Sequence, residues 1–151
     1  MTQTAGTPSS PVPPEQFANQ FALWWEGRHG ARSEGRVFGY LLFTGTPQSV
    51  QDLTSSLGVS ASSLPAALGS LERQGLVQRV RLPGKRRIYY TLHSDYVGHL
   101  LLIWLERIDN LHALALEARD AGTTPDTAAA FVSFCAHLSD TVTELLATSN
   151  D

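Results

Sequence analysis

Apolar side chains recur at helical spacing near the start of the chain. Residues 15–30 place them along one face, which predicts a helix that Gly30 ends. After a short break, the same spacing predicts a second, shorter helix before Gly45 and Pro47, with its apolar side formed by Val37, Tyr40 and Leu41. Both helices are therefore expected to pack against a core through one face.

Two further short helices are predicted next. Ser49 and Asp52 have the spacing of a capping box, which indicates a helix over about residues 50–57. Gly58 can adopt the left-handed conformation that ends a helix, and Ser60 can cap the following one. That following helix carries its apolar side chains on one face: Leu64, Ala67, Leu68 and Leu71. Two short helices across a turn of about three residues form the outline of a helix-turn-helix.

The spacing changes from helical to alternating after Gly75. Residues 76–92 read LVQRVRL, PGK and RRIYYTL, which predicts a β-hairpin. A three-residue loop pairs Val80 with Ile88 and Arg81 with Arg87, so that one face is apolar and the other cationic. A two-residue Pro-Gly loop would pair Val80 with Arg87 and mix the faces, so we favour the longer loop.

Two longer amphipathic helices are predicted in the last third of the chain. The first covers about residues 96–121 and carries the stripe Leu101, Trp104, Leu105, Ile108, Leu111 and Ala115. The second starts at Pro125 and carries the stripe Ala128, Phe131, Cys135, Leu138, Val142 and Leu145. With the helix at 15–30, they present more apolar surface than a lobe of about 70 residues can cover. We therefore expect an isologous homodimer built from these helices.

The pattern as a whole predicts a mainly α fold with one small β-hairpin. Four parts are expected along the chain. Residues 1–14, where prolines alternate with Thr and Ser, form a disordered tail, and residues 15–32 form an N-terminal dimerisation helix. Residues 33–95 form the lobe of helix-turn-helix and hairpin, and residues 96–151 form a C-terminal helical dimerisation region.

Length and composition exclude several classes of protein. The chain has 151 residues, of which 42% are hydrophobic and 17% are charged, as in an ordinary globular protein. No apolar run reaches the roughly 18 residues of a membrane span, and no signal segment opens the chain. A single cysteine excludes an internal disulfide framework and suits a reducing compartment. We expect a soluble, cytoplasmic protein without a membrane partner.

Basic side chains are concentrated in one segment. The net charge is −3, yet residues 73–93 contain no acidic side chain and hold six basic ones: Arg73, Arg79, Arg81, Lys85, Arg86 and Arg87. Residues 94–151 hold nine acidic side chains and two basic ones. Repulsion elsewhere would turn the basic segment toward a polyanion, so the distribution of charge indicates nucleic acid where the net charge does not.

Specific motifs accompany this order of elements. They are Gly35-Arg36-Val37, Asp52-Leu53, Leu57-Gly58-Val59-Ser60, Leu68, Leu71-Glu72, Gly75-Leu76-Val77, the run Leu82-Pro83-Gly84-Lys85-Arg86-Arg87, and Tyr89-Tyr90. Over about residues 20–100 the chain resembles the winged helix-turn-helix of MarR-type transcriptional regulators, and especially the GbsR-like branch. The resemblance implies a homodimer on operator DNA, with the helix at 60–73 in the major groove and the hairpin as a wing near the backbone or minor groove.

On this interpretation, double-stranded DNA is contacted by small side chains of the second helix and by the basic segment. The residues are Ser60, Ser62, Ser63, Ala66, Ser70, Arg73, Arg79, Arg81, Lys85, Arg86 and Arg87. Guanidinium groups suit phosphates and narrow minor grooves, whereas the small groups lack bidentate reach to bases. Two plainer interpretations stay open: the hairpin is a solvated edge whose charges prevent aggregation, and the serines only cap a helix.

Pro65 departs from the resemblance, since a serine or similar polar residue is usual at the matching position. With Ser60 as N-cap, the proline removes the N–H that would bond the carbonyl of Ala61. We expect a local distortion of the helix that reads DNA. Pro65→Ser is expected to raise stability by about 1–3 kcal/mol and to alter the sequence preference.

Patterns for catalysis or metal binding are weak. Ser139-Asp140 and the scattered histidines form no known nucleophile or metal motif, so we expect no enzyme activity, no cofactor and no metal. His29 is expected at the surface, and Cys135 as a buried, inert thiol. The aromatic side chains Trp24, Trp25 and Trp104 favour core packing, and a second interpretation is a pocket for a small-molecule effector.

The sequence therefore favours a sequence-specific, homodimeric transcriptional regulator, for which a response to a small-molecule ligand stays an open alternative. The rival interpretation is a winged-helix protein-interaction module whose basic hairpin binds an acidic partner.

Overall fold

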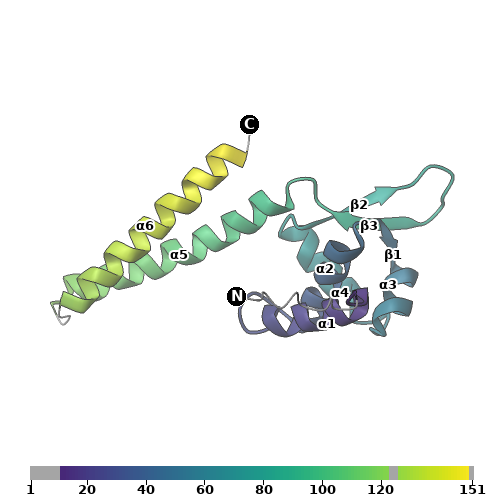
Figure 1. The fold of residues 1–151 in the computed structure, drawn as a ribbon, viewed down its shortest axis with the longest axis horizontal. Coiled ribbons are helices and arrows are strands. Elements are labelled where there is room, and N and C mark those ends of the chain that lie inside the picture. The colour runs from purple at the N-terminus through teal and green to yellow at the C-terminus, as the bar shows by residue number, and fades with distance from the viewer. Residues whose placement is uncertain (1–10, 123–125, 150–151) are drawn as a thin grey trace, which may run out of the picture. The chain divides into compact units, whose positions relative to one another are not determined.

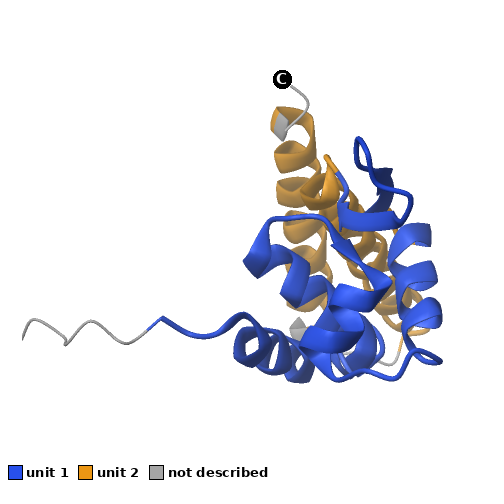
Figure 2. Ribbon diagram, turned by 90° about the vertical axis from the view of Figure 1, so that its right-hand side faces the viewer, with its two compact units in different colours: residues 1–73, 77–93 blue, residues 74–76, 94–151 orange. Residues whose placement is uncertain are grey.

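The computed structural model describes residues 11–122 and 126–149, which form helices and a three-stranded antiparallel sheet (Figure 1). The chain divides into two compact units (Figure 2). Unit 1 contains residues 1–73 and 77–93, and unit 2 contains residues 74–76 and 94–151. The predicted tail at residues 1–14 falls mostly outside the described residues, as does Pro125, the predicted start of the last helix.

Unit 1 begins with two helices that pack against each other, α1 (Pro14–Trp25) and α2 (Arg32–Thr44). α1 ends at Trp25 rather than near residue 30, because Glu26 adopts an extended conformation. The chain then turns back, and the N–H of His29 donates to the carbonyl of Trp25 (2.8 Å). The imidazole of His29 lies against the Trp25 ring, with centroids 3.9 Å apart, so the side chain is half-buried rather than fully exposed.

Two glycines on α2 permit its close approach to α1. A Cβ atom on Gly35 would lie 2.7 Å from Cβ of Trp25 and 2.9 Å from Cα of Ala22. A Cβ atom on Gly39 would lie 2.9 Å from Cβ of Phe21. Carbon atoms do not approach this closely, so any larger side chain would push the two helices apart. The glycines thus bring the aromatic side chains of α1 into the core of unit 1.

The next helix confirms its sequence prediction in full. Strand β1 (Gln48–Ser49) leads directly into α3 (Val50–Leu57). Both hydrogen bonds of the capping box are present: the N–H of Asp52 donates to Oγ of Ser49 (3.1 Å), and the N–H of Ser49 donates to the Asp52 carboxylate (2.8 Å). Hydrogen bonds from Ser49, first from its backbone and then from its side chain, lower the pKa of Asp52. Gly58 ends the helix with a φ of 60°.

Helix α4 (Leu64–Arg73) starts later than predicted. The connection from α3 covers residues 58–63, and the N–H of Leu64 donates to the carbonyl of Ser60 (3.3 Å) before the helix proper. Pro65 therefore lies in the first turn of α4, where a helix does not need the backbone N–H that proline lacks. The predicted loss of an internal hydrogen bond at Pro65 is wrong for this reason.

The hairpin of unit 1 consists of β2 (Val77–Arg81) and β3 (Ile88–Leu92). β1 pairs with the other side of β3, which gives the strand order β1-β3-β2. The third strand was not predicted, because a segment of two residues is too short to show an alternating pattern.

The pairing of the hairpin differs by one residue from the predicted register. Val80 lies opposite Tyr89, and Arg81 lies opposite Ile88. The loop covers residues 82–87, so Arg87 belongs to the loop and not to the paired strand. Opposite residues share a face of the sheet, and Arg81 therefore shares one with an apolar partner. The predicted separation into an apolar and a cationic face is wrong.

Unit 2 consists mainly of two long helices that pack side by side, α5 (Tyr96–Asp120) and α6 (Asp126–Ser149) (Figure 1). Their bounds agree with the predicted helices. Cys135 is buried, as expected. Many large apolar side chains are nevertheless exposed: Val97, Leu102, Trp104, Leu111, Leu114, Phe131, Phe134, Leu138 and Leu145. No helix in the described part of the chain is both long and apolar enough to cross a membrane.

His99 contacts the short turn at residues 74–76, which belongs to unit 2. Gly75 has a φ of 71°, and its carbonyl oxygen lies 2.7 Å from Nδ1 of His99 on α5. A Cβ atom on Gly75 would lie 2.6 Å from the same nitrogen, so the ring packs directly against the glycine. No local pattern indicated this role of His99, because the two residues lie far apart in the chain.

Candidate nucleic-acid interface

The outer face of α4 presents small side chains, as predicted. Its buried face is formed by Leu64, Ala67, Leu68 and Leu71. On the other side, Ala66 is exposed and Ser70 is half-buried, and Ser62 and Ser63 are exposed in the preceding turn. Arg73 is exposed at the last turn of the helix. This arrangement gives α4 an outer surface of small side chains, and the major groove of DNA is wide enough to admit such a helix.

The serines before α4 bond to one another. Oγ of Ser60 lies 3.1 Å from Oγ of Ser62 and 3.0 Å from Oγ of Ser63. The Ser63 hydroxyl also donates to the carbonyl oxygen of Ser60 (3.1 Å). Ser60 therefore does not cap the helix as predicted. The three exposed hydroxyls instead hold each other in the turn, where each keeps a free lone pair or proton for another partner.

The wing carries the basic side chains predicted for it. Arg81 on β2 and Lys85 and Arg86 in the loop are exposed. Within residues 11–122 and 126–149, none of these three side chains forms an ion pair. Their charges are therefore available to an external anion such as a phosphate group.

Arg79 differs from the other wing cations. Its Nε donates to both carboxylate oxygens of Glu72 on α4, at 3.1 and 2.9 Å. The hydrogen bond to Glu72, and then the charge of Glu72, raise the pKa of Arg79. Glu72 lies just before the acid-free segment 73–93, so the count of charges along the chain overstated the free charge of the wing. Its contact with DNA stays a prediction.

Arg87 is exposed, and its side chain is hydrogen-bonded to α3. Its Nη1 donates to Oε1 of Gln51, at the start of α3. The positive charge of Arg87 also contributes to the lowered pKa of the neighbouring Asp52. This arrangement ties the end of the wing loop to the helix-turn-helix.

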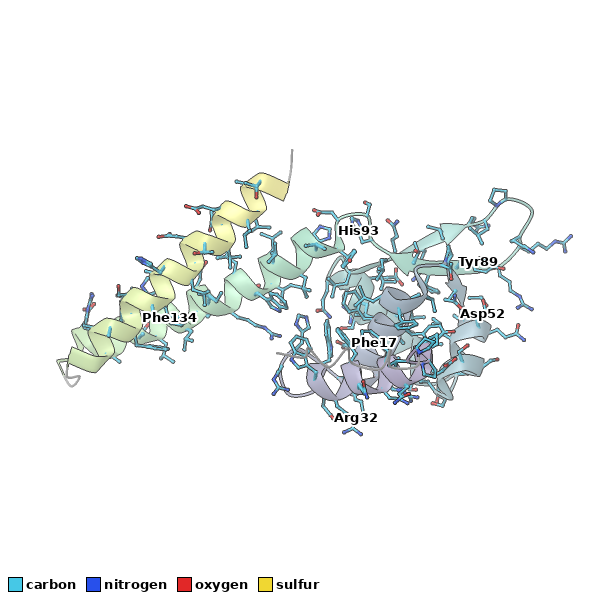
Figure 3. The ribbon with its side chains drawn as sticks, viewed as in Figure 1. Phe17, Arg32, Asp52, Tyr89, His93 and Phe134 are labelled. Carbon is cyan, nitrogen blue, oxygen red and sulfur yellow. The ribbon has the colours of Figure 1, made fainter. Side chains whose placement is uncertain are left out.

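A groove of about 770 Å³ lies between α3 and the wing. Figure 3 labels Asp52 on α3 and Tyr89 on β3, the two elements that flank it. Its walls are lined by Ser49, Val50, Gln51, Thr54, Ser55, Ala61, Arg86, Arg87, Ile88 and Tyr90. The groove therefore combines hydroxyl groups, apolar side chains and two guanidinium groups on one side of unit 1.

Three residues hold the helix-turn-helix and the wing in place, and the sequence did not predict their roles: Gln51, Glu72 and Arg36. Arg36 on α2 donates through Nε to Oδ1 of Asn19 (3.0 Å) and through Nη2 to the carbonyl of Leu57 at the end of α3. It thus ties the position of α3 to α1 and α2. These contacts join residues 17 or more positions apart, so no local pattern could have indicated them.

The tryptophans predicted to line an effector pocket lie in different surroundings. Trp25 is fully buried in unit 1, where its ring packs against Phe21 and Phe38 at centroid distances of 5.6 and 5.3 Å. Trp24 is exposed on unit 1, and Trp104 belongs to unit 2. Trp25 thus has the core role that the sequence favoured, and the effector pocket stays a prediction.

A helix-turn-helix followed by an antiparallel hairpin with a basic loop defines a winged-helix lobe. Residues 31–88, from the start of α2 to the start of β3, match the model of the MarR family. This lobe is therefore similar to the MarR family.

Among curated proteins, the HTH-type transcriptional regulator MmpR5 of Mycobacterium tuberculosis is 28% identical over 81 residues. The match covers 53% of this chain and 49% of the relative, so it spans about half of each.

One solved structure shares the fold, and a second is less similar. A crystal structure of a transcriptional regulator is 22% identical, with a TM-score of 0.64, over 91% of this chain and 97% of the other. A mutant MarR from E. coli in complex with operator DNA is 15% identical, with a TM-score of 0.42, over 80% of this chain and 81% of the other. The second likeness is too weak to transfer a DNA-bound pose.

Proposed function

We propose that the protein is a sequence-specific DNA-binding transcriptional regulator that acts as a homodimer in the cytoplasm. One observation carries the proposal: unit 1 presents the small side chains of α4 together with a wing on which Arg81, Lys85 and Arg86 form no ion pair with any described residue. The family match and the name of the mycobacterial relative support it.

The chemistry of this function is reversible binding. The wing cations neutralise phosphates and release counterions, which supplies affinity without regard to sequence. α4 lies in the major groove, where its small side chains allow a close approach but offer no bidentate contacts to bases. Much of the specificity then comes from the shape of the DNA, read by arginines in a narrow minor groove. The run Leu82-Pro83-Gly84-Lys85-Arg86-Arg87 supports assignment to the GbsR-like branch.

A homodimer explains the exposed apolar side chains of unit 2. Leu114 and Phe134 are 62% and 60% exposed, although each belongs to a long amphipathic helix. Exposed apolar surface of this extent indicates an interface with another chain. A twofold dimer would place two α4 helices about 34–36 Å apart, so we expect a palindromic operator. A small-molecule effector near the exposed Trp24 or Trp104 belongs to the same proposal.

The test begins with a mobility shift on the DNA upstream of the protein's own gene, at several salt concentrations. The variant Lys85→Ala with Arg86→Ala should weaken binding to all DNA sequences by a similar factor. It should also flatten the slope of log K against log salt by about 0.9 for each lost phosphate contact.

Arg79→Ala is the matched control, because Glu72 already balances the charge of Arg79. Its effect on the salt slope should be the smaller of the two. An unchanged slope in the double variant would show that the wing does not contact phosphates. Wild-type protein that shifts no DNA but binds an acidic peptide would favour the rival function of a protein-interaction module.

A further inference from the structure

We propose that Gln51 is a positioning residue for the wing. Through its hydrogen bond with Arg87 it holds the end of the wing loop against α3 without neutralising the guanidinium. The groove between α3 and the wing is then held in place to bind one sugar-phosphate strand of DNA. The inference rests on the proposed function and assigns a further part of the interface to it.

The first support is the position of Gln51 on a rigid element. Gln51 is the second residue of α3 and lies inside the capping box that Ser49 and Asp52 form. Both hydrogen bonds of that box are made, so the backbone at Gln51 is fixed. A side chain on a fixed backbone can restrain a mobile partner, because its own ordering costs less. The loop that carries Arg87, by contrast, is exposed from residue 83 onward.

The second support is that the group that accepts the hydrogen bond from Arg87 is a neutral amide. The Gln51 amide oxygen is neutral, so Arg87 keeps its net charge while one of its five N–H groups is occupied. Arg79 on β2 is held differently, because the carboxylate of Glu72 both orients its guanidinium and balances its positive charge. The neutral acceptor orients Arg87 without forming an ion pair with it, so the guanidinium can still bind a phosphate. The remaining N–H groups of Arg87 and the whole guanidinium of Arg86 line the groove.

The third support is the character of the groove. Val50 and Ile88 expose 37% and 38% of their surface there, beside the two guanidinium groups. The exposed hydroxyl of Ser55 lies along the same walls. A sugar-phosphate strand alternates an apolar sugar with an anionic phosphate, and it accepts hydrogen bonds from hydroxyls. The lining thus offers a matching partner to each part of such a strand.

Two substitutions at Gln51 separate positioning from charge. Gln51→Leu removes the acceptor and leaves every cation in place. Binding to DNA should weaken about three- to tenfold, the expected cost of ordering one freed long side chain, while the salt slope stays unchanged. Gln51→Glu keeps Arg87 in place but balances its charge. Binding should weaken here too, and the salt slope should flatten by about 0.9 for the lost phosphate contact.

The thermal midpoint separates these effects from misfolding. An acidic side chain in the first turn of α3 interacts favourably with the helix dipole, so Gln51→Glu should melt at or above the temperature of the wild type. Gln20→Leu and Gln20→Glu are matched controls, because Gln20 is an exposed glutamine on α1. The Glu control corrects for the change in net charge, and both controls should bind DNA like the wild type.

Two results would overturn the inference. If wild-type protein binds DNA and Gln51→Leu binds equally well at every salt concentration, Gln51 does not position the wing, and the proposed function stands. The same conclusion follows if Gln51→Glu leaves the salt slope unchanged. If wild-type protein binds no DNA at any salt concentration, the proposed function fails, and this inference fails with it.

Discussion

Unit 1 closes a core of its own, whereas unit 2 leaves most of its apolar surface uncovered. In unit 1, α1 to α4 and the sheet bury large side chains completely, among them Trp25, Phe38, Leu53, Leu64, Leu68 and Leu71. The described side chains of α5 and α6 include few that are buried: Val132, Cys135 and Val142. Gly98, near the start of α5, is buried as well. The two units thus differ in how much of their stability they supply alone.

The number of elements that pack together explains why the two units bury their apolar side chains to different extents. Two helices that pack side by side can cover only one face of each other, and the rest of a broad apolar stripe stays exposed. Four helices and a sheet enclose a shared interior. Unit 1 should therefore fold independently of protein concentration, whereas the stability of unit 2 should depend on association with a second chain.

The largest effect should follow from opening the core of unit 1. Phe38 is 1% exposed and packs on Phe21 and Trp25 at centroid distances of 5.8 and 5.3 Å. Phe38→Ala should lower the free energy of unfolding by about 3–5 kcal/mol in urea titrations. Phe43→Ala is the matched control, because Phe43 is 44% exposed and should cost much less. Equal losses for the two variants would contradict a closed core in unit 1.

The next effect concerns the open face of unit 2. Leu114→Glu with Phe134→Glu should weaken the dimer by at least about 2 kcal/mol, because both charges would be buried without partners at the interface. Sedimentation equilibrium should then return the monomer mass of 16.4 kDa at micromolar concentration. Ser133→Glu adds a charge next to Phe134 at an exposed polar position and should leave the dimer intact. If the wild type is itself monomeric, the exposed apolar side chains of unit 2 do not form a dimer interface.

A smaller effect is expected from the capping box of α3. Asp52→Asn weakens the hydrogen bond from the Ser49 N–H and should cost about 0.5–1 kcal/mol at pH 7. Because the pKa of Asp52 is lowered in the folded state, its carboxylate stabilises the protein above its unfolded pKa of about 3.9. That contribution is lost as the pH falls through the folded pKa. Urea titrations should show the gap between variant and wild type closing below about pH 4, and a constant gap would contradict it.

The smallest effect should come from Pro65. A proline in the first turn of a helix loses no hydrogen bond and restricts the unfolded chain. Pro65→Ser should therefore lower stability, by less than about 1 kcal/mol, which is the opposite sign to the expectation from sequence. Thermal melts of both proteins measure the difference. A clear gain in stability would mean that the helix starts before Leu64 after all.

Local signals in the sequence were enough for several elements. The capping box at Ser49, the end of α3 at Gly58 and both long helices of unit 2 occur where the pattern predicts them. Each is signalled by residues within about four positions of one another, so the signal can be found without knowing which segments of the chain pack together. The same holds for the exposed face of α4, because helical periodicity fixes which side chains lie opposite the buried leucines.

Tertiary structure decided the features that join distant segments. The hairpin register depends on how the six residues from 82 to 87 turn, and a shift of one residue reassigns every face. The packing of α1 on α2 depends on the close approach that Gly35 allows to Trp25 and Ala22. The pairing of Arg79 with Glu72 and the bond between Arg87 and Gln51 depend on where β2 and α3 lie in space. A sequence shows that these cations are present, and only the packing of the elements determines which of them face an external anion.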